Sequence, residues 1–220
     1  GGDGAKEGTP EQKAKAEAKK KAKADAKAAK KKANAAAAPA GGAGSAAGAA
    51  GDADVVTKLN MVVGLIKKAW KHPDSDKLWC EEIDIGGEKP RQIASGLRKF
   101  YENESDLEGR KVLVLANLKA KKLGGFPSEG MVLCASNEAH DVVKFVEVPA
   151  DAVIGERVHF EGLEGEPATP AQIGKKKVLE EVLPLLVTNA EGVCTYKGEK
   201  AFLLSNGQCT APVGEGFHVA

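Results

Sequence analysis

The chain has 220 residues, of which 42% are hydrophobic and 5% aromatic, and its formal net charge is +1. This length is enough for one domain or two small ones. No apolar run approaches the roughly 20 residues that a membrane helix needs, and the N-terminal region lacks the apolar segment of a signal peptide. We therefore expect a cytoplasmic protein without a membrane anchor. Because the sequence has no initiator Met, we expect it to be the C-terminal piece of a longer polypeptide.

The charge is distributed unevenly along the chain. Residues 1–38 contain eleven Lys and five acidic residues, which gives +6, and the remaining residues contain 21 Lys and Arg against 26 acidic residues, which gives −5. Because the second part is acidic overall, polyanion binding there would need local basic clusters. The sequence has two such clusters, at 119–122 and at 175–177.

Residues 1–33 form an arm of Lys, Ala and acidic residues. Its lysines recur every four residues, at Lys15, Lys19, Lys23, Lys27 and Lys31, so in a helix they would share one face. No side chain larger than Ala is available for an opposite apolar face, so the arm cannot pack as a core helix, and alone its helicity would be marginal. It is either a basic arm that adds sequence-independent phosphate contacts to nucleic acid or a solvated linker. The sequence does not decide between the two.

Residues 34–54 are mostly Ala, Gly and Ser, the composition of a flexible linker. From residue 55 the composition becomes that of a globular, β-rich unit. The predicted strands are 61–67, 79–85, 92–95, 111–117, 131–135, 142–148 and 157–160. Short strands separated by turn signals, without a long helical period among them, indicate a small barrel or sandwich. We prefer the barrel.

The stretch from Ala116 to Ser136 organises this unit. It leaves an apolar run, passes three lysines within four positions, crosses Gly124, Gly125 and Pro127, and enters a second apolar run. This order predicts a strand, a basic loop and a strand. Ammonium groups beside a Ser-Glu-Gly turn suit contacts to phosphates and base edges better than they suit catalysis.

Four motifs carry a resemblance to a known family: HPDSDKLWCEEIDIGG (72–87), ASGL (94–97), ANLKAKKLGG (116–125) and SEGMVLCAS (128–136). They resemble the tRNA-binding domain of the family of endothelial monocyte-activating polypeptide II. The resemblance continues through KKKVLEEVLPLLVTN (175–189) and CTYKG (194–198), so it covers roughly residues 58–210. Members of this family are fused to the C-terminus of methionyl- or tyrosyl-tRNA synthetases or act as free cofactors of those enzymes.

The resemblance implies a mainly β fold. An oligonucleotide-binding (OB) barrel, a five-stranded and partly open Greek-key barrel, would occupy residues 55–162 and bind tRNA. A small C-terminal α+β domain, residues 163–220, would imitate the dimer interface of bacterial relatives, so we expect a monomer in this region. Val178 and Val182 occur at helical spacing before Pro184, which predicts a short helix packed on the barrel.

The residues that we expect to contact tRNA come from three motifs. In order of preference they are Lys119, Lys121 and Lys122 with Ser128 and Glu129, then Ser95 and Arg98, then Lys77. Taken singly, each lysine is as well explained as a solvated surface charge, but their clustering in a matching motif favours RNA contact. The family usually carries an Arg at position 124 and a Pro at position 120. This chain has neither, so phosphate contacts are kept while a guanidinium fork onto a base is lost.

Other candidate sites are weaker. His72 before Pro73 and Asp74 is better explained by a turn capped by its own side chains than by a metal or acid–base site. The aromatic residues Trp70, Trp79, Phe100 and Tyr101 either stack on bases or, as we favour, pack in the core and at its rim. The four cysteines form no CxxC pair, so we expect free thiols. We find no nucleotide loop, nucleophile motif or zinc spacing, and expect neither cofactor, metal nor catalysis.

Our leading hypothesis is a tRNA-binding module, largely independent of sequence, that holds tRNA for an aminoacyl-tRNA synthetase. A methionyl-tRNA synthetase is the preferred parent, and a tyrosyl-tRNA synthetase or a free cofactor remains open. The rival class is a protein-interaction module of a multi-synthetase complex, in which RNA binding is incidental. A cytokine-like fragment is a further alternative that we do not carry over, because the corresponding segment, 62–68, matches the family's cytokine pattern poorly.

Overall fold

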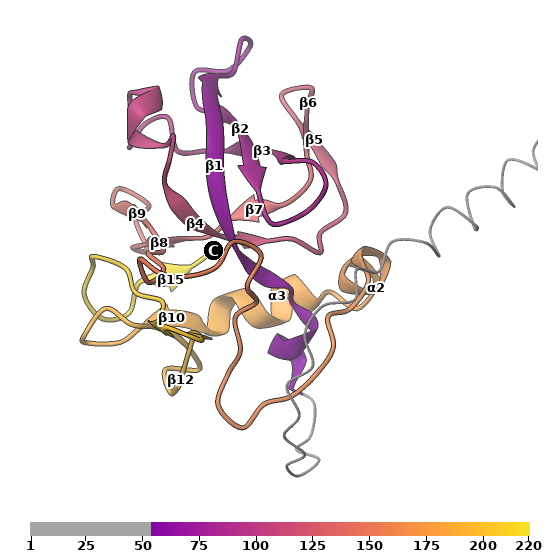
Figure 1. The fold of residues 1–220 in the computed structure, drawn as a ribbon. Helices are drawn as coiled ribbons and strands as arrows, with labels where there is room; N and C mark the ends of the chain where they lie inside the picture. Colours follow the sequence, from indigo (N-terminus) through magenta and orange to yellow (C-terminus); the bar gives the residue numbers. More distant parts are fainter. Residues whose placement is uncertain (1–53) are drawn as a thin grey trace, which may run out of the picture. The chain divides into compact units, whose positions relative to one another are not determined.

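The structure is a computed structural model that describes residues 54–220 (Figure 1). The arm and most of the linker therefore lie outside the described residues. The strands are β1 (Met61–Lys71), β2 (Trp79–Asp84), β3 (Arg91–Ser95), β4 (Lys111–Leu115), β5 (Lys121–Leu123), β6 (Phe126–Ser128), β7 (Met131–Val132), β8 (Cys134–Ser136), β9 (Val143–Phe145), β10 (Leu186–Thr188), β11 (Cys194–Tyr196), β12 (Lys200–Ala201), β13 (Leu203–Leu204), β14 (Gly207–Gln208) and β15 (His218–Val219). The helices are α2 (Pro170–Lys175) and α3 (Val178–Val182), with 3-10 turns η1 (Val55–Lys58), η2 (Glu104–Asp106) and η3 (Leu183–Leu185).

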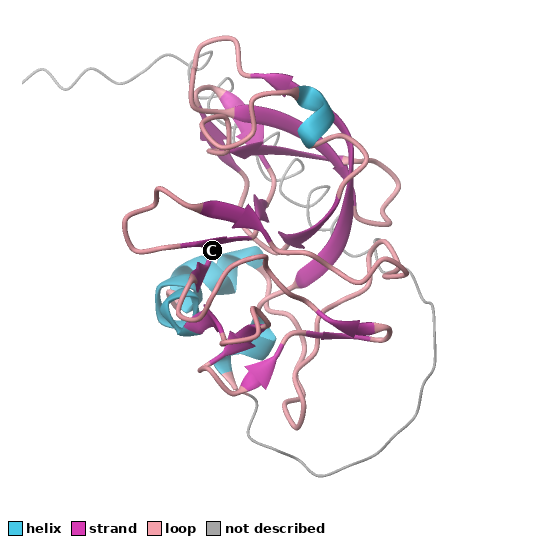
Figure 2. Ribbon diagram, turned by 90° about the vertical axis from the view of Figure 1, so that its left-hand side faces the viewer, coloured by secondary structure: helices cyan, strands magenta, loops and turns pink. Residues whose placement is uncertain are grey.

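A five-stranded antiparallel sheet in the order β3-β2-β1-β4-β7 forms the barrel. Its edge strands β3 and β7 lie in contact, so the barrel is nearly closed. Strongly curved strands are visible in the upper part of Figure 2. The mainly β fold with an OB barrel, predicted from the sequence, is confirmed.

Strand β4 and the first part of β1, residues 61–66, are buried on both faces. Val112 and Val114 of β4 point into the barrel core, whereas Leu113 and Leu115 belong to a second, larger core. Successive side chains of a strand point to opposite faces, so a strand between two cores must be apolar throughout. This explains why the sequence here is a continuous run of Val and Leu rather than an alternating pattern.

A second sheet, in the order β12-β11-β10-β15-β8-β9, packs below the barrel with α2 and α3 (Figure 1). The predicted short helix is confirmed as α3, and its residues Val178 and Val182 are fully buried in the larger core. Pro184 follows in the 3-10 turn η3. Helix α2 begins with a capping box in which Thr169 accepts a hydrogen bond from the backbone of Gln172, as expected for an N-terminal Thr followed by Gln.

Two strand predictions need correction. The predicted strand 131–135 is split at Leu133, because β7 pairs with β4 in the barrel whereas β8 pairs with β9 and β15 in the second sheet. The predicted strand 157–160 makes only isolated bridges, Val62 with Arg157, His159 with Leu203 and Phe160 with Leu163. These three bridges reach different parts of the fold, so no continuous ladder forms there.

The boundary placed at residue 162 stays a prediction, and the structure adds that packing runs across it. The second sheet combines β8 and β9 with strands from the C-terminal segment. The buried side chain of Asn117 accepts from the backbone of Asn60 and donates to the carbonyls of Lys58 and Ala168. A buried amide with all of these partners fixes the segments that it joins.

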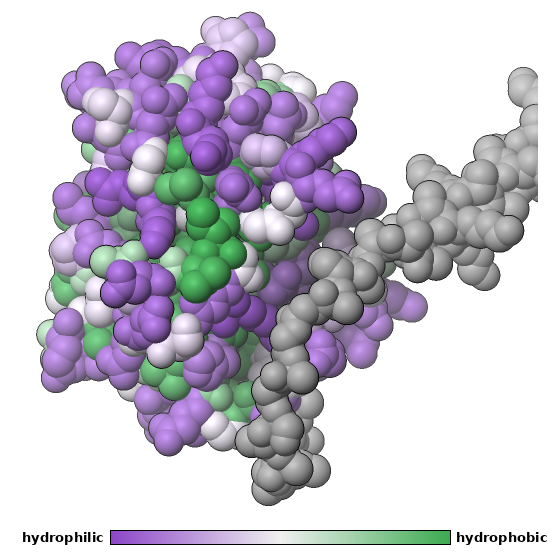
Figure 3. All heavy atoms as spheres, viewed as in Figure 1, coloured by the Kyte–Doolittle hydropathy of each residue, from purple (hydrophilic) through white to green (hydrophobic). Residues whose placement is uncertain are grey.

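The face shown in Figure 3 is mostly hydrophilic, with one band of hydrophobic residues near its centre. The most exposed large apolar side chain in residues 54–220 is Val153, at 62%. Within the same residues, no helix combines the length and the apolar character that crossing a membrane requires.

Candidate nucleic-acid interface

The basic segment is a β-hairpin rather than the loop that the sequence predicts. Strands β5 and β6 pair antiparallel, with Lys121 opposite Ser128 and Leu123 opposite Phe126. They are joined by Gly124 and Gly125, whose φ angles are +57° and +90°. Two left-handed residues in a row are typical of tight hairpin turns, which is why the sequence places glycines there. Lys119, Lys121 and Lys122 are all exposed on this hairpin and its approach.

Aromatic contacts anchor the tip of the hairpin to the β1–β2 turn. The ring of Phe126 stands edge-on to Trp70 and to His72, with centroids 5.7 and 6.4 Å apart. The imidazole of His72 is buried, and its Nδ1 accepts a hydrogen bond from the backbone N–H of Asp74 at 3.1 Å. The interpretation of this segment as a self-capped turn is therefore confirmed. The same imidazole lies directly against Gly124.

The root of the hairpin is held by hydrogen bonds to β3, an edge strand of the barrel sheet. The hydroxyl of Ser128 accepts from the N–H of Ala94 at 3.1 Å and donates to the carbonyl of Gly130 at 3.0 Å. Glu129 donates its N–H to the carbonyl of Gln92 at 2.8 Å, and its carboxylate accepts from the N–H of Gln92 at 3.1 Å. Ser128 is only 5% exposed, so its side chain has a structural task.

Ser95 is also largely buried. Its hydroxyl donates a 2.6 Å hydrogen bond to Oε1 of Glu81, a residue with no exposed surface. The other carboxylate oxygen, Oε2, has no hydrogen-bond partner among residues 54–220. Burial raises the pKa of Glu81 to about 7, an effect that the Ser95 hydroxyl only partly offsets. Sequence reasoning missed Glu81, although its place between buried Trp79 and Ile83 in a period-2 strand points it inward.

The remaining predicted RNA contacts come together beside the β1–β2 turn. The guanidinium of Arg98 donates to the carbonyl of Ser75 at 2.6 Å, and its backbone N–H reaches the carbonyl of Lys77. Lys77 is exposed. Of the candidate stacking residues, Trp79 is fully buried, with its indole N–H donating to the carbonyl of Tyr101. The predicted RNA contacts stay predictions, and the arm lysines lie outside the described residues.

A groove of about 270 Å³ separates the hairpin from helices α2 and α3. Lys119, Lys121 and Leu123 line it on the barrel side, and Ile173 and Leu179 line the opposite wall. The second basic cluster, 175–177, lies in sequence between two lining residues, and all three of its lysines are exposed. The two basic clusters, far apart in sequence, therefore both belong to the surroundings of this groove. One acidic residue, Glu180, also lines it.

The model of the family described as "Putative tRNA binding domain" matches residues 61–157. The crystal structure of the C-terminal domain of Plasmodium vivax p43 is similar over 75% of this chain and 98% of that chain, with 36% identity and a TM-score of 0.69. The chain belongs to this tRNA-binding domain family. The hairpin, β3 and the β1–β2 turn discussed above all lie inside the matched residues.

Longer proteins contain the same domain. A probable methionine–tRNA ligase of Oryza sativa is 48% identical over 154 residues, which are 70% of this chain and 19% of the relative. The aminoacyl tRNA synthase complex-interacting multifunctional protein 1 of Mus musculus is 39% identical over 155 residues, which are 70% of this chain and 49% of the relative. The chain thus spans at most about half the length of these two relatives.

The structure offers little for metal or thiol chemistry in this region. Within residues 54–220, no group of three or more His, Cys, Asp or Glu is arranged to hold a metal ion. The four cysteines are free and buried. Burial raises the pKa of Cys134 and Cys194 far above the ordinary value, which keeps them as unreactive thiols.

Replacing Glu81 by Gln is expected to stabilise the fold more at pH 8 than at pH 5. Because the pKa of Glu81 rises from an ordinary 4.5 to about 7 on folding, the folded state holds its proton over a range where the unfolded state has lost it. The free energy of unfolding therefore falls as the pH rises from about 4.5 to about 7, by up to about 3 kcal/mol. Urea unfolding of both proteins at the two pH values measures the difference. An equal change in the free energy of unfolding at both pH values would contradict the raised pKa of Glu81.

Replacing Gly124 by Arg is expected to destabilise the fold by about 1–3 kcal/mol. Position 124 has a φ of +57°, and a Cβ there would lie 2.8 Å from Cε1 of His72. The family's Arg would therefore need the buried imidazole to move. Thermal unfolding measures the loss, with Gly87→Ala as control, since Gly87 has an ordinary φ and its Cβ would meet nothing closer than 3.8 Å. A melting temperature for Gly124→Arg equal to the control would refute the steric argument.

Proposed function

We propose that this chain binds tRNA through the exposed lysines of the β5–β6 hairpin and holds it for an aminoacyl-tRNA synthetase. The observation that carries the proposal is the hairpin itself. It presents Lys119, Lys121 and Lys122 to solvent while its root and tip are fixed to the barrel. Contacts to phosphate supply most of the affinity for nucleic acids, and a fixed hairpin loses little conformational entropy on binding.

The charges of the hairpin are available for RNA. Within residues 54–220, one ion pair is formed, between Lys197 and Asp54 at 3.2 Å, so none of the three hairpin lysines is neutralised by a neighbouring carboxylate. The adjoining groove has apolar walls between the two basic clusters. Such a surface suits a ribose–phosphate chain whose shape is recognised more than its sequence.

The synthetase would gain a higher effective concentration of tRNA near its active site. A tRNA held by this module stays near an active site in the same polypeptide or complex, which raises apparent affinity without any new contact to the enzyme. We favour a methionyl-tRNA synthetase as the parent, because the rice relative named above is a methionine–tRNA ligase in which this domain is a small part. A free cofactor is the alternative, since the mouse relative is named as a complex-interacting protein. In either setting we propose a monomeric, cytoplasmic module.

Replacing Lys119, Lys121 and Lys122 together by Ala is expected to weaken tRNA binding by at least tenfold at low salt. The slope of log K against log salt should flatten by about one unit for each lost phosphate contact. Filter binding at four salt concentrations gives both quantities. A slope equal to that of the wild-type chain would refute the assignment of the hairpin.

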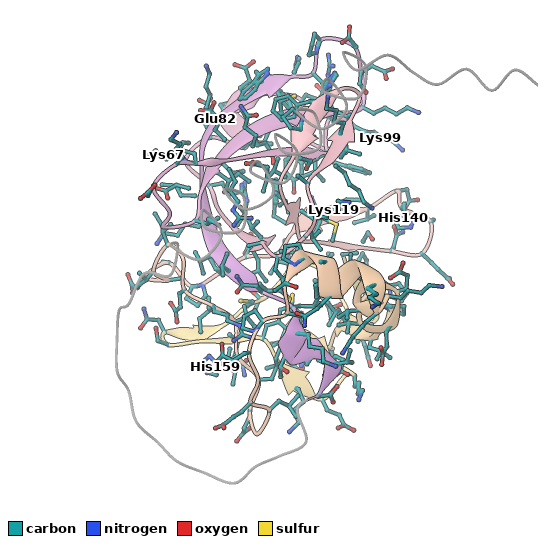
Figure 4. The ribbon with its side chains drawn as sticks, turned by 90° about the vertical axis from the view of Figure 1, so that its right-hand side faces the viewer. Lys67, Glu82, Lys99, Lys119, His140 and His159 are labelled. Atoms are coloured by element: carbon teal, nitrogen blue, oxygen red, sulfur yellow. The ribbon has the colours of Figure 1, made fainter. Side chains whose placement is uncertain are left out.

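A matched pair of single variants separates local contact from overall charge. Lys67 and Lys119 are both exposed, and Figure 4 shows them well apart, Lys67 at the left edge of the molecule and Lys119 near the centre of the view. Lys119→Ala and Lys67→Ala change the net charge equally. A difference in tRNA affinity between the two variants therefore reports a local contact with the RNA. We expect weaker tRNA binding for Lys119→Ala only. Equal losses would mean that the hairpin acts through the total field.

Deleting residues 1–53 is expected to lower the affinity for tRNA and for an unrelated RNA duplex by the same factor. The arm would add phosphate contacts that do not depend on RNA shape. Both affinities are measured with the shortened chain and with the full chain at one salt concentration. A loss confined to tRNA would mean that the arm recognises tRNA shape.

A further inference from the structure

A second cavity, of about 350 Å³, opens beside the hairpin between the end of β3 and the strands β7 and β8. Its volume falls within the range of pockets that hold small ligands. Most of its lining is apolar, from side chains such as Leu97, Leu123, Met131 and Val143. Phe100, half-buried, adds an aromatic ring. The proposed contacts of the hairpin lysines with phosphate do not use this cavity.

The polar part of the lining is unusual because a buried carboxyl group lies directly behind it. Ser95 lines the cavity, and its hydroxyl donates to Glu81. Glu81 has no exposed surface, and within residues 54–220 its second oxygen has no partner. A buried carboxyl with an unused oxygen is costly, and such groups call for an explanation in a native structure. Cys134, which lines the same cavity, is close enough for Glu81 to raise its pKa.

Cations lie around the mouth of this cavity. The ammonium of Lys99 lies 5.6 Å from the ring centroid of Phe100. Leu123, which lines the cavity, directly follows the hairpin lysines Lys121 and Lys122. Figure 4 shows Lys99 and the cavity-lining His140 on the right-hand side of the molecule, with Lys119 nearer the centre of the view. An aromatic ring, an apolar wall and nearby ammonium groups match the base and the phosphate of one nucleotide.

We propose that this cavity takes a single unpaired RNA base that presents an amino group where guanine and uracil present a carbonyl oxygen, adenine or cytosine, with Ser95 as its polar contact and Glu81 as the positioning residue behind Ser95. This inference rests on the proposed tRNA binding and adds to it a point of base recognition. The phosphates of the bound strand would lie over the lysines at the rim.

The direction of the Ser95 hydrogen bond sets the preference. Above about pH 7 the carboxylate of Glu81 is ionised and can only accept, so it holds the hydroxyl proton and Ser95 offers only oxygen lone pairs to a ligand. An amino group of adenine or cytosine can donate to them. The carbonyl O4 that uracil presents at the corresponding position is itself an acceptor and would leave both oxygens unpaired. A guanidinium fork, which this chain lacks at position 124, is not needed for such a contact.

The test compares short RNA chains that differ in one base. Five-nucleotide chains are made of abasic riboses with a single central adenine, cytosine or uracil, or with no base, so that the phosphates stay constant. Fluorescence anisotropy at pH 8, where Glu81 is ionised, measures their binding to the full 220-residue chain. We expect adenine and cytosine to bind about fivefold more tightly than uracil, the effect of one net hydrogen bond. Equal affinity for the three bases would overturn the proposal.

Two serine variants locate the contact. Ser95→Ala is expected to abolish the preference for adenine and cytosine over uracil. Ser136→Ala is the matched control, because Ser136 lines the same cavity and is buried to a similar extent. We expect this control to keep the preference. A preference that survives Ser95→Ala, or that disappears equally in both variants, would refute the role of Ser95.

Glu81→Gln provides an independent check in case Ser95→Ala does not fold. Its amide can donate to Ser95 and release the hydroxyl proton toward the ligand, so the preference over uracil should shrink or reverse. An unchanged preference would remove Glu81 from the proposal. Binding of tRNA without any base preference would sink this inference alone, whereas a failure to bind both tRNA and the abasic chain would contradict the proposed function as well.

Discussion

The hydrogen bonds from Ser128 and Glu129 to the free edge of β3 decide where the basic hairpin lies. The hydrogen-bonded ladder of the barrel sheet ends at β3, so the outward N–H groups of Gln92 and Ala94 have no ladder partner, although β6 and β7 lie beside β3. A side-chain hydroxyl and a carboxylate accept from them instead. An unpaired strand edge is both costly and prone to pairing with other chains. The hydrogen bonds that satisfy this edge also fix the root of the hairpin. The same contacts therefore protect the edge of the sheet and hold the hairpin lysines in place.

The two cores on either side of β1 and β4 connect the position of the hairpin to the packing of the C-terminal segment. Leu113 and Leu115 share a core with Val178 and Val182 of α3, while Val112 and Val114 face the barrel interior. Close-packed interiors transmit displacement rather than absorb it. A shift of α3 would therefore move β4, whose C-terminal end leads through residues 116–120 into the hairpin. The groove between hairpin and helices thus has two walls built on one packed unit, and its width is set by side-chain volume in the larger core.

The sequence predicts the parts of this fold that depend on local pattern. Apolar runs predict β1, β2 and β4 to within a few residues, because a strand that is buried on one or both faces has mostly apolar residues on those faces. The split at Leu133 left no such mark, since Val132 and Cys134 are apolar in either sheet. The hairpin was missed because Lys121 to Leu123 is wholly exposed and is held by Phe126 against Trp70, more than fifty positions earlier. Ser95 was chosen from a motif, but its partner Glu81 lies fourteen positions away, and no pattern joins the two.

The distribution of charge separates two tasks that a uniformly basic protein would combine. Residues 39–220 carry −5 while residues 1–38 carry +6, so the described part of the chain cannot attract RNA from a distance by its total field. Its hairpin lysines act over a few ångströms, within the roughly 8 Å over which physiological salt leaves charges unscreened. Such short-range contacts depend on geometry, which explains why the hairpin is fixed at both ends. A rigid set of lysines on an acidic body favours an RNA whose phosphates fit that spacing over one that merely carries charge.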